Sequence, residues 1–230
     1  MKTIGLIGGM SWESTQSYYR LLNLGVKKRL GGLHSAKIIL YSVDFAPIEA
    51  MQREGKWDQA GKVLEGAAHA LEKAGAELLL LCTNTMHKVA PIITHTLNIP
   101  FIHIANATAQ ALQKENKHHA ILLGTKFTMQ EDFYISVLEK EGIRVTIPDA
   151  KAIEMINRII FDELCLGLCE KNSKQYFLDT IHHLYHDDKT IDSIILGCTE
   201  IGLLLEEKDS FLPLFDTTLL HVNEALHHAL

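Results

Sequence analysis

The sequence predicts an α/β fold of two pseudo-symmetric domains, each a mostly parallel sheet flanked by helices. Apolar runs typical of strands alternate with longer segments of helical periodicity along the 230 residues, which is the pattern of parallel sheets covered on both faces. A repeat supports two similar halves. Cys82 and Cys198 each follow an apolar run and precede a threonine, and their spacing of 116 residues (198 − 82) also separates Gly8 from Gly124.

Glycines and prolines mark the expected elements of the first half. Gly8 and Gly9 permit a sharp turn after the first apolar run, and a glycine pair at 31–32 ends the first helix. The leucine run before Cys82 is typical of a strand buried on both faces, and Pro91 should bend the helix that follows. The expected strands are 2–7, 37–43, 77–81 and 100–104; the expected helices are 12–30, 57–74, 86–97 and 105–115, with a short helix or loop at 48–53.

The second half restarts the same order of elements after residue 118. A strand ends at Gly124, and Gly142 ends the next helix. The expected strands are 119–123, 144–147, 191–196 and 213–215; the expected helices are 129–141, 152–168, 174–185 and 218–230. We predict a first domain of residues 1–97 plus 213–230 and a second of residues 98–212, with the site in the cleft between them.

Composition excludes several classes of function. The net charge of −6 argues against nucleic acid as a partner, because binding the phosphate backbone requires clustered Lys and Arg. No apolar run is long enough to span a membrane. The first residues are typical of a strand and lack a signal-peptide cleavage site, so we expect a cytoplasmic protein whose four cysteines are reduced.

The two Cys-Thr pairs lie where strands are expected to end, the usual ligand position in open α/β sheets. Two thiols on opposite sides of one carbon suit stereoinversion, because one can remove a proton while the other delivers a proton to the opposite face. Backbone N–H groups at helix N-termini would stabilise a thiolate or a substrate carboxylate. Four polar residues of these turns could also hold a carboxylate: Thr83, Asn84, Thr85 and Thr199.

Four stretches carry a family resemblance: IGLIGGMSWEST at 4–15, CTNTMH at 82–87, LGTKFTM at 123–129 and GCTE at 197–200. Through them the sequence resembles the aspartate/glutamate racemases, which are cofactor-independent amino-acid racemases of two α/β domains. The resemblance spans nearly the whole chain, and the cysteine motifs are its most specific part.

The resemblance implies a racemase of L- and D-aspartate and/or glutamate that uses two bases and no cofactor and that forms a homodimer. No metal site is expected, because most of the thirteen histidines lie in solvated or terminal contexts. Cys82 and Cys198 are the implied catalytic pair, and Thr83 is a second candidate for the first face. The implied substrate-binding residues are Met10, Gln52, Thr83, Asn84, Thr85, Thr125, Thr199 and Glu200. Arg53 is a further candidate, because arginine suits bidentate binding of a carboxylate.

Structural roles compete with several of these assignments. An unpaired cysteine after a strand is more often a small buried apolar residue than a catalyst. Cys165 and Cys169 lie at i,i+4 on an expected helix and should pack in the core. His87 could orient the site or simply belong to a helix N-terminus. Glu200 could tune the Cys198 thiol, bind the substrate amine, or favour the start of a helix.

Other functions stay open beside racemisation. A decarboxylase or a cis–trans isomerase of small dicarboxylates could use the same cysteine positions, and a non-catalytic dicarboxylate-binding protein could retain the cleft alone. A dinucleotide-binding oxidoreductase is the weakest alternative, because the glycines at 5, 8 and 9 follow Gly-x-x-Gly-Gly and not Gly-x-Gly-x-x-Gly.

Overall fold

The computed structural model describes residues 1–230 and divides the chain into two compact units. The first unit is Met1–Ile104 with His221–Leu230, and the second is Ala105–Leu220. The first contains β1 (Ile4–Gly8), β2 (Ile38–Ser42), β3 (Leu78–Leu81), α1 (Trp12–Leu30), α2 (Phe45–Arg53), α3 (Trp57–Lys73), the 3-10 helix η1 (Thr85–Val89), α4 (Ala90–Thr94) and most of α11 (Thr217–Ala229).

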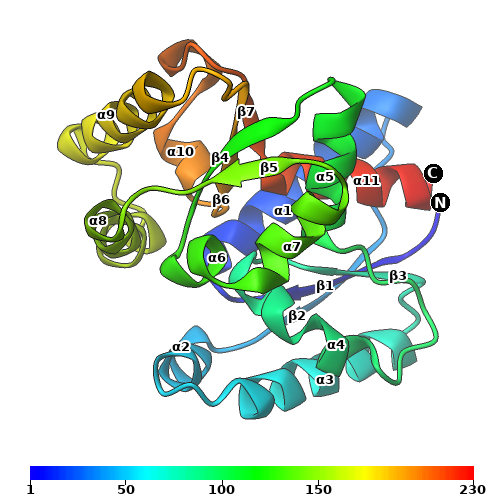
Figure 1. Cartoon of the computed structure of the whole chain (residues 1–230). Helices are drawn as coiled ribbons and strands as arrows, with labels where there is room; N and C mark the ends of the chain where they lie inside the picture. The colour runs from blue at the N-terminus through cyan, green and yellow to red at the C-terminus, as the bar shows by residue number, and fades with distance from the viewer. The chain divides into compact units, whose positions relative to one another are not determined.

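The first unit is a parallel sheet of order β2-β1-β3 covered on both faces. Leu78 and Leu80 face a core cluster formed with α1 and α11, whereas Leu79 and Leu81 face a cluster formed with α2, α3 and α4. This alternation is the period of two that a strand dictates, and it confirms the prediction that the leucine run is buried on both faces. Figure 1 shows α3 and α4 together along one side of β1.

The helix α1 begins and ends where its sequence requires. The Ser11 side chain accepts a hydrogen bond from the Ser14 N–H, and Glu13 lies in the first turn. At the other end, Gly31 has a φ of 74°, a conformation that glycine adopts readily. The start of α1 also contacts the loop after β3, because the Ser14 hydroxyl donates to the Cys82 carbonyl at 2.8 Å.

The second unit is a four-stranded parallel sheet of order β5-β4-β6-β7. Its strands are β4 (His119–Gly124), β5 (Arg144–Thr146), β6 (Ser193–Gly197) and β7 (Leu214–Asp216). Its helices are α5 (Ile104–Lys114), α6 (Lys126–Gln130), α7 (Asp132–Lys140), α8 (Ala150–Asp162), α9 (Lys171–Asp187) and α10 (Ile201–Leu204), with 3-10 helices η2 (Leu164–Leu166) and η3 (Glu207–Asp209). In Figure 1, α8 and α9 pack against each other.

Several expected elements differ from the structure. Residues 100–104 form no strand and only one bridge, Leu79 to Phe101, because α5 already begins at Ile104. The strand at 213–215, which we assigned to the first domain, pairs as β7 with β6 in the second unit, and the chain returns to the first unit at His221. The helix expected at 129–141 is two helices, α6 and α7, that meet at Glu131 in an extended conformation.

None of the helices combines the length and the apolar character that crossing a bilayer requires.

Gly9 is the position where the backbone tolerates a side chain least. Its φ is 95°, and a Cβ there would lie 2.1 Å from the Val43 carbonyl oxygen and 2.7 Å from the Val43 nitrogen. Gly9→Ala should therefore lower the free energy of unfolding by about 2–4 kcal/mol, because both the strain and the clash involve backbone. Urea unfolding followed by tryptophan fluorescence measures this, because Trp12 and Trp57, the only tryptophans, both lie in the first unit.

Gly66→Ala is the matched control for that measurement. Gly66 lies within α3, where an added Cβ meets nothing within 4 Å. Alanine favours a helix over glycine by up to about 1 kcal/mol, so this variant should equal or exceed the wild type in stability. Equal stability of Gly9→Ala and Gly66→Ala would contradict the prediction.

Candidate functional site

The first unit brings most of its predicted site residues to the carboxyl ends of β1 and β3. These strands are neighbours that pair Ile7 with Leu81. Met10 follows β1, and the segment from Cys82 to Thr85 follows β3, so both turns emerge at one edge of the sheet. The Cys82 N–H donates to the Ile7 carbonyl at 2.9 Å, which extends the pairing one residue beyond the strand.

The second unit has the same arrangement at the ends of β4 and β6. Gly124 pairs with Gly197, and the next residues are Thr125 and Cys198. The buried Thr125 caps α6 by accepting the Thr128 N–H on its hydroxyl oxygen at 3.3 Å. Thr199 and Glu200 continue from Cys198 into the start of α10. The structure therefore brings four of the predicted residues to one sheet edge within this unit.

The two cysteines are not structurally equivalent, although their spacing predicted that they would be. Gly8 and Gly124 mark matching strand ends, because a Cβ on Gly8 would meet Thr15 and a Cβ on Gly124 would meet Thr128. Ile7 pairs with Leu81 in one unit, but Leu123 pairs with Leu196 in the other. The pairing of β3 with β1 is therefore displaced by one residue compared with the pairing of β6 with β4. Cys82 matches Gly197 in position, and Thr83 matches Cys198.

The displacement turns the Cys82 side chain into the core of the first unit. Cys82 is fully buried in the cluster that contains Tyr18, Leu80 and Val222. Burial raises the pKa of the Cys82 thiol, because a thiolate there would lose its hydration. Thr83, in contrast, is only partly buried. In this unit the hydroxyl, not the thiol, is the more accessible of the two groups.

Cys198 has a carboxylate as its immediate partner. Its thiol donates to Glu200 Oε2 at 3.0 Å, and the Thr199 hydroxyl donates to the same oxygen at 2.5 Å. Both Cys198 and Glu200 are buried. Burial raises the pKa of the Cys198 thiol, and the charges of Glu200 and Cys165 raise it further. The geometry favours a thiol whose proton is already directed at an acceptor, which is the arrangement of a nucleophile or base with an adjacent carboxylate.

Gln52 and Met10 are held on the α2–α3 side of the first sheet. Gln52 is buried, and its Nε2 lies 2.9 Å from the sulfur of Met86, the residue that follows Thr85. Met10 is buried in the same core cluster as Met86. Arg53 points elsewhere: its side chain is 72% exposed and lies 3.9 Å from Glu49 on the same helix. A carboxylate held by Arg53 would be held in solvent, where an ion pair contributes little.

Cys165 and Cys169 do not share a helix face, contrary to the expectation. The helix α8 ends at Asp162, Cys165 lies in η2, and the left-handed Gly167 turns the chain before Cys169. Cys165 is partly buried and Cys169 is exposed. The helical pattern of the sequence continued past the true end because the residues at 164–168 remain largely apolar.

The first unit contains a cluster of three histidines, His87, His103 and His221, of which the sequence pattern indicated only His87. The His221 Nε2–H donates to the Ile102 carbonyl at 2.7 Å, and its Nδ1 accepts from the Tyr18 hydroxyl at 2.8 Å. The His87 ring lies 4.6 Å from the His103 ring and 5.7 Å from the His221 ring, centroid to centroid. No pattern in the sequence predicts the burial of His221, which lies near the end of the chain.

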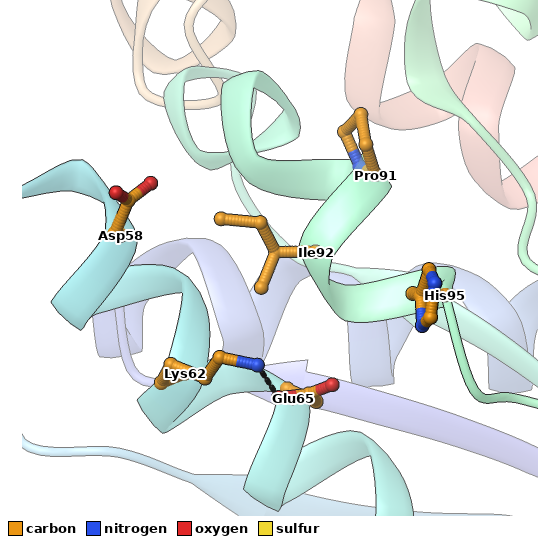
Figure 2. Close-up of a pocket in the computed structure, with 6 residues that line it drawn as sticks. All are labelled: Asp58, Lys62, Glu65, Pro91, Ile92 and His95. Carbon is orange, nitrogen blue, oxygen red and sulfur yellow. Dashed lines mark hydrogen bonds and ion pairs between the residues drawn. The ribbon is translucent and has the colours of Figure 1, made fainter.

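A surface pocket of about 510 Å³ lies between α3 and α4, and Figure 2 shows the residues that line it. It is lined by Asp58, Lys62, Glu65, Pro91, Ile92 and His95, with Lys62 paired to Glu65 at 2.8 Å. None of the predicted site residues lines it. The structure contains no group of three or more His, Cys, Asp or Glu side chains arranged to hold a metal ion.

A sequence model described as Asp/Glu/Hydantoin racemase matches residues 7–225. The chain belongs to this family. The match contains every predicted site residue, from Met10 to Glu200.

Members of the Asp/Glu/Hydantoin racemase family resemble the chain in both sequence and structure. The structure of a presumed Asp/Glu racemase from Yersinia pestis is 49% identical, with a TM-score of 0.91 over 100% of this chain and 99% of that one. An aspartate racemase homologue from Pyrococcus horikoshii is 36% identical, with a TM-score of 0.84 over 100% and 99%. The broad specificity amino-acid racemase RacX of Bacillus subtilis is 26% identical over 94% of this chain and 92% of its own length.

The predicted fold class is confirmed. The chain has two parallel sheets flanked by helices, as the solved structures of the Asp/Glu/Hydantoin racemase family members do. The relatives are named racemases, which are isomerases.

Proposed function

We propose that this chain is an amino-acid racemase that interconverts L- and D-aspartate and/or glutamate by a two-base mechanism without a cofactor. One protein group removes the α-proton from one face of the substrate, and a second group delivers a proton to the opposite face. The observation that carries this proposal is the Cys198–Glu200 pair at a sheet edge, in a chain whose family and relatives are racemases.

Cys198 serves one face of the α-carbon. When its thiol proton passes to Glu200, the sulfur becomes a base able to accept the α-proton. In the reverse direction the Cys198 thiol donates its proton to the carbanion, and Glu200 carries no proton. The pair therefore gains one proton in the forward direction and loses one in the reverse direction, and in each case it returns to its starting state by exchanging a proton with solvent.

The opposite face is served by Thr83 or by Cys82. Two observations support Thr83: it matches Cys198 in strand register, and it is partly exposed whereas Cys82 is enclosed in the core. A Thr83 hydroxyl would donate its proton to the carbanion and regain one from solvent. Asn84, Thr85, Thr125 and Thr199 are proposed to bind the substrate with Met10 and Gln52. A homodimer stays a prediction from the resemblance, and a cytoplasmic location stays a prediction from the N-terminal sequence.

An α-proton exchange screen tests the function. The protein is incubated in D₂O with each common L- and D-amino acid, and loss of the α-proton signal is followed by NMR while chiral chromatography follows inversion. We expect exchange and inversion with aspartate or glutamate, ending at equal amounts of both enantiomers.

Three further measurements separate the alternatives. Release of CO₂ from a dicarboxylate would indicate a decarboxylase, and geometric isomerisation of an unsaturated dicarboxylate would indicate a cis–trans isomerase. Dicarboxylate binding measured by calorimetry, without any exchange of the α-proton, would reduce the chain to a binding protein and contradict the proposal.

A further inference from the structure

Both peptide groups that flank the Thr83 Cα are held by buried side chains. The Cys82 carbonyl, on the N-terminal side, accepts the Ser14 hydroxyl at 2.8 Å. The N–H of the same peptide, which belongs to Thr83, donates to the Leu81 carbonyl at 2.9 Å. The Thr83 carbonyl, on the C-terminal side, lies 2.8 Å from His87 Nδ1. These bonds restrict φ and ψ at Thr83 and thereby the direction of its side chain.

The hydrogen bonds of His87 define its tautomer. Its Nε2 lies 3.2 Å from the Ile104 N–H and accepts from it, so the ring proton is on Nδ1 and is donated to the Thr83 carbonyl. Burial lowers the pKa of His87 well below its usual value, and the nearby His103 and His221 lower it further. His87 is therefore a neutral donor over the whole physiological pH range.

Ser14 and His87 are themselves firmly placed. Ser14 lies in the first turn of α1 and is 2% exposed, and its N–H is bound by the Ser11 hydroxyl. His87 is 1% exposed within η1, and its ring also contacts Phe101 with centroids 5.5 Å apart. Each donor belongs to a different element, so α1 and η1 hold the two sides of Thr83 independently.

The second unit holds Cys198 in a different way. There the Cys198 carbonyl accepts a backbone N–H, that of Ile201, at 3.1 Å, and Glu200 contacts the thiol itself. Around Thr83, two buried side chains hydrogen-bond the backbone carbonyls. The corresponding strand end at Cys198 does not share this feature.

We propose that Ser14 and His87 are positioning residues that aim the Thr83 side chain at the substrate by fixing the two peptide groups beside it. This inference rests on the proposed racemase function with Thr83 as one of its two groups. A displacement of about 1 Å at a reacting group can lower a rate by about 10²-fold. Loss of either donor should thus slow proton transfer at Thr83 and leave proton transfer at Cys198 intact.

The test compares Ser14→Ala, His87→Leu and His87→Asn. The first two remove a donor, whereas the asparagine amide retains one near the position of Nδ1. We expect kcat to fall roughly 10- to 100-fold in Ser14→Ala and His87→Leu, and most of the rate to be retained in His87→Asn. The substrate is L- and D-glutamate or aspartate, whichever the wild type inverts faster.

A deuterium isotope effect on kcat/KM, measured with each α-deuterated enantiomer, separates positioning from general loss of structure. In Ser14→Ala and His87→Leu, proton transfer at Thr83 should limit the rate. The isotope effect should then rise for the enantiomer that Thr83 deprotonates, and it should fall towards 1 for the other enantiomer. Cys198→Ser should skew the two effects in the opposite direction. A smaller fraction of folded enzyme changes neither effect.

His221→Asn is the matched control, because His221 is a buried neutral histidine of the same cluster bonded to Tyr18 and Ile102. It should lower stability without skewing the isotope effects. Isotope effects unchanged from the wild type in Ser14→Ala and His87→Leu would overturn the inference, and Ser14→Ala decides alone if His87→Leu does not fold. An inactive wild type would instead remove the racemase function, and the positioning role with it.

Discussion

Replacing Cys198 with alanine should lower the rate of racemisation by at least roughly 10²-fold, because a positioned general acid or base contributes about 10²–10⁴-fold. Alanine removes the sulfur that contacts Glu200 at 3.0 Å and that we propose exchanges the proton with the substrate. The rate is followed by circular dichroism of the amino acid, and the far-ultraviolet spectrum of the protein checks that the fold is retained.

Cys169→Ala is the matched control, because Cys169 is an exposed cysteine of the same unit. It should retain the activity of the wild type. Retained activity in Cys198→Ala would remove this residue from the mechanism and with it the two-base proposal.

The first unit offers a second comparison within the same experiment. Thr83→Ala should be nearly inactive, whereas Cys82→Ala should retain much of the activity and mainly lose packing in the core cluster. The reverse order of activities would show that Cys82, not Thr83, serves the first face.

Acid should destabilise the first unit from about pH 6.5 downward. Burial lowers the pKa of His103 to about 4 and that of His221 to about 3, and it lowers the pKa of His87 as well. An unfolded histidine binds its proton near pH 6.5. Between that pH and the folded pKa values the unfolded state binds more protons, so the free energy of unfolding decreases as the pH falls through this window. Above pH 6.5 the stabilisation is complete.

The expected loss is on the order of several kcal/mol between pH 6.5 and pH 4, because each pKa unit corresponds to about 1.4 kcal/mol. Urea titrations at pH 7.5, 6.0 and 5.0, followed by tryptophan fluorescence, report on the first unit alone. His221→Gln removes one titrating group and should give a shallower dependence on pH. A free energy of unfolding that is constant from pH 7.5 to 5.0 would contradict the neutral, buried state of the cluster.

The sequence predicted the elements with strong local signals and failed where tertiary pairing decides. The leucine run of β3 and the glycine turn after β1 are local signals, and both are confirmed. The strand expected at 100–104 has the right residues but pairs through Phe101 alone. The helix expected up to Leu168 ends at Asp162, because an apolar pattern does not reveal where a helix stops.

The sequence motifs predicted where the candidate site lies, but they did not predict its geometry. The spacing of 116 residues aligns Cys82 with Cys198 in sequence, and only the strand pairing reveals that Thr83 is the matching position. Ser14 and His221 gave no signal, because a buried serine or histidine is recognised by its partners and these are distant in sequence. The cleft predicted between the halves stays a prediction.

The discontinuous first unit has a consequence for synthesis. Its core includes Val222 and Leu226 of α11. The Lys2 N–H, just before β1, donates to the Ala229 carbonyl at 2.9 Å, so the two ends of the chain lie next to each other (Figure 1). Residues 105–220 form an uninterrupted unit, whereas the first unit is completed only by residues 221–230, which follow that unit in the chain. The usual order, in which the N-terminal part of a chain matures first, therefore does not hold for the first unit, because its core cannot close before residues 221–230 have been made.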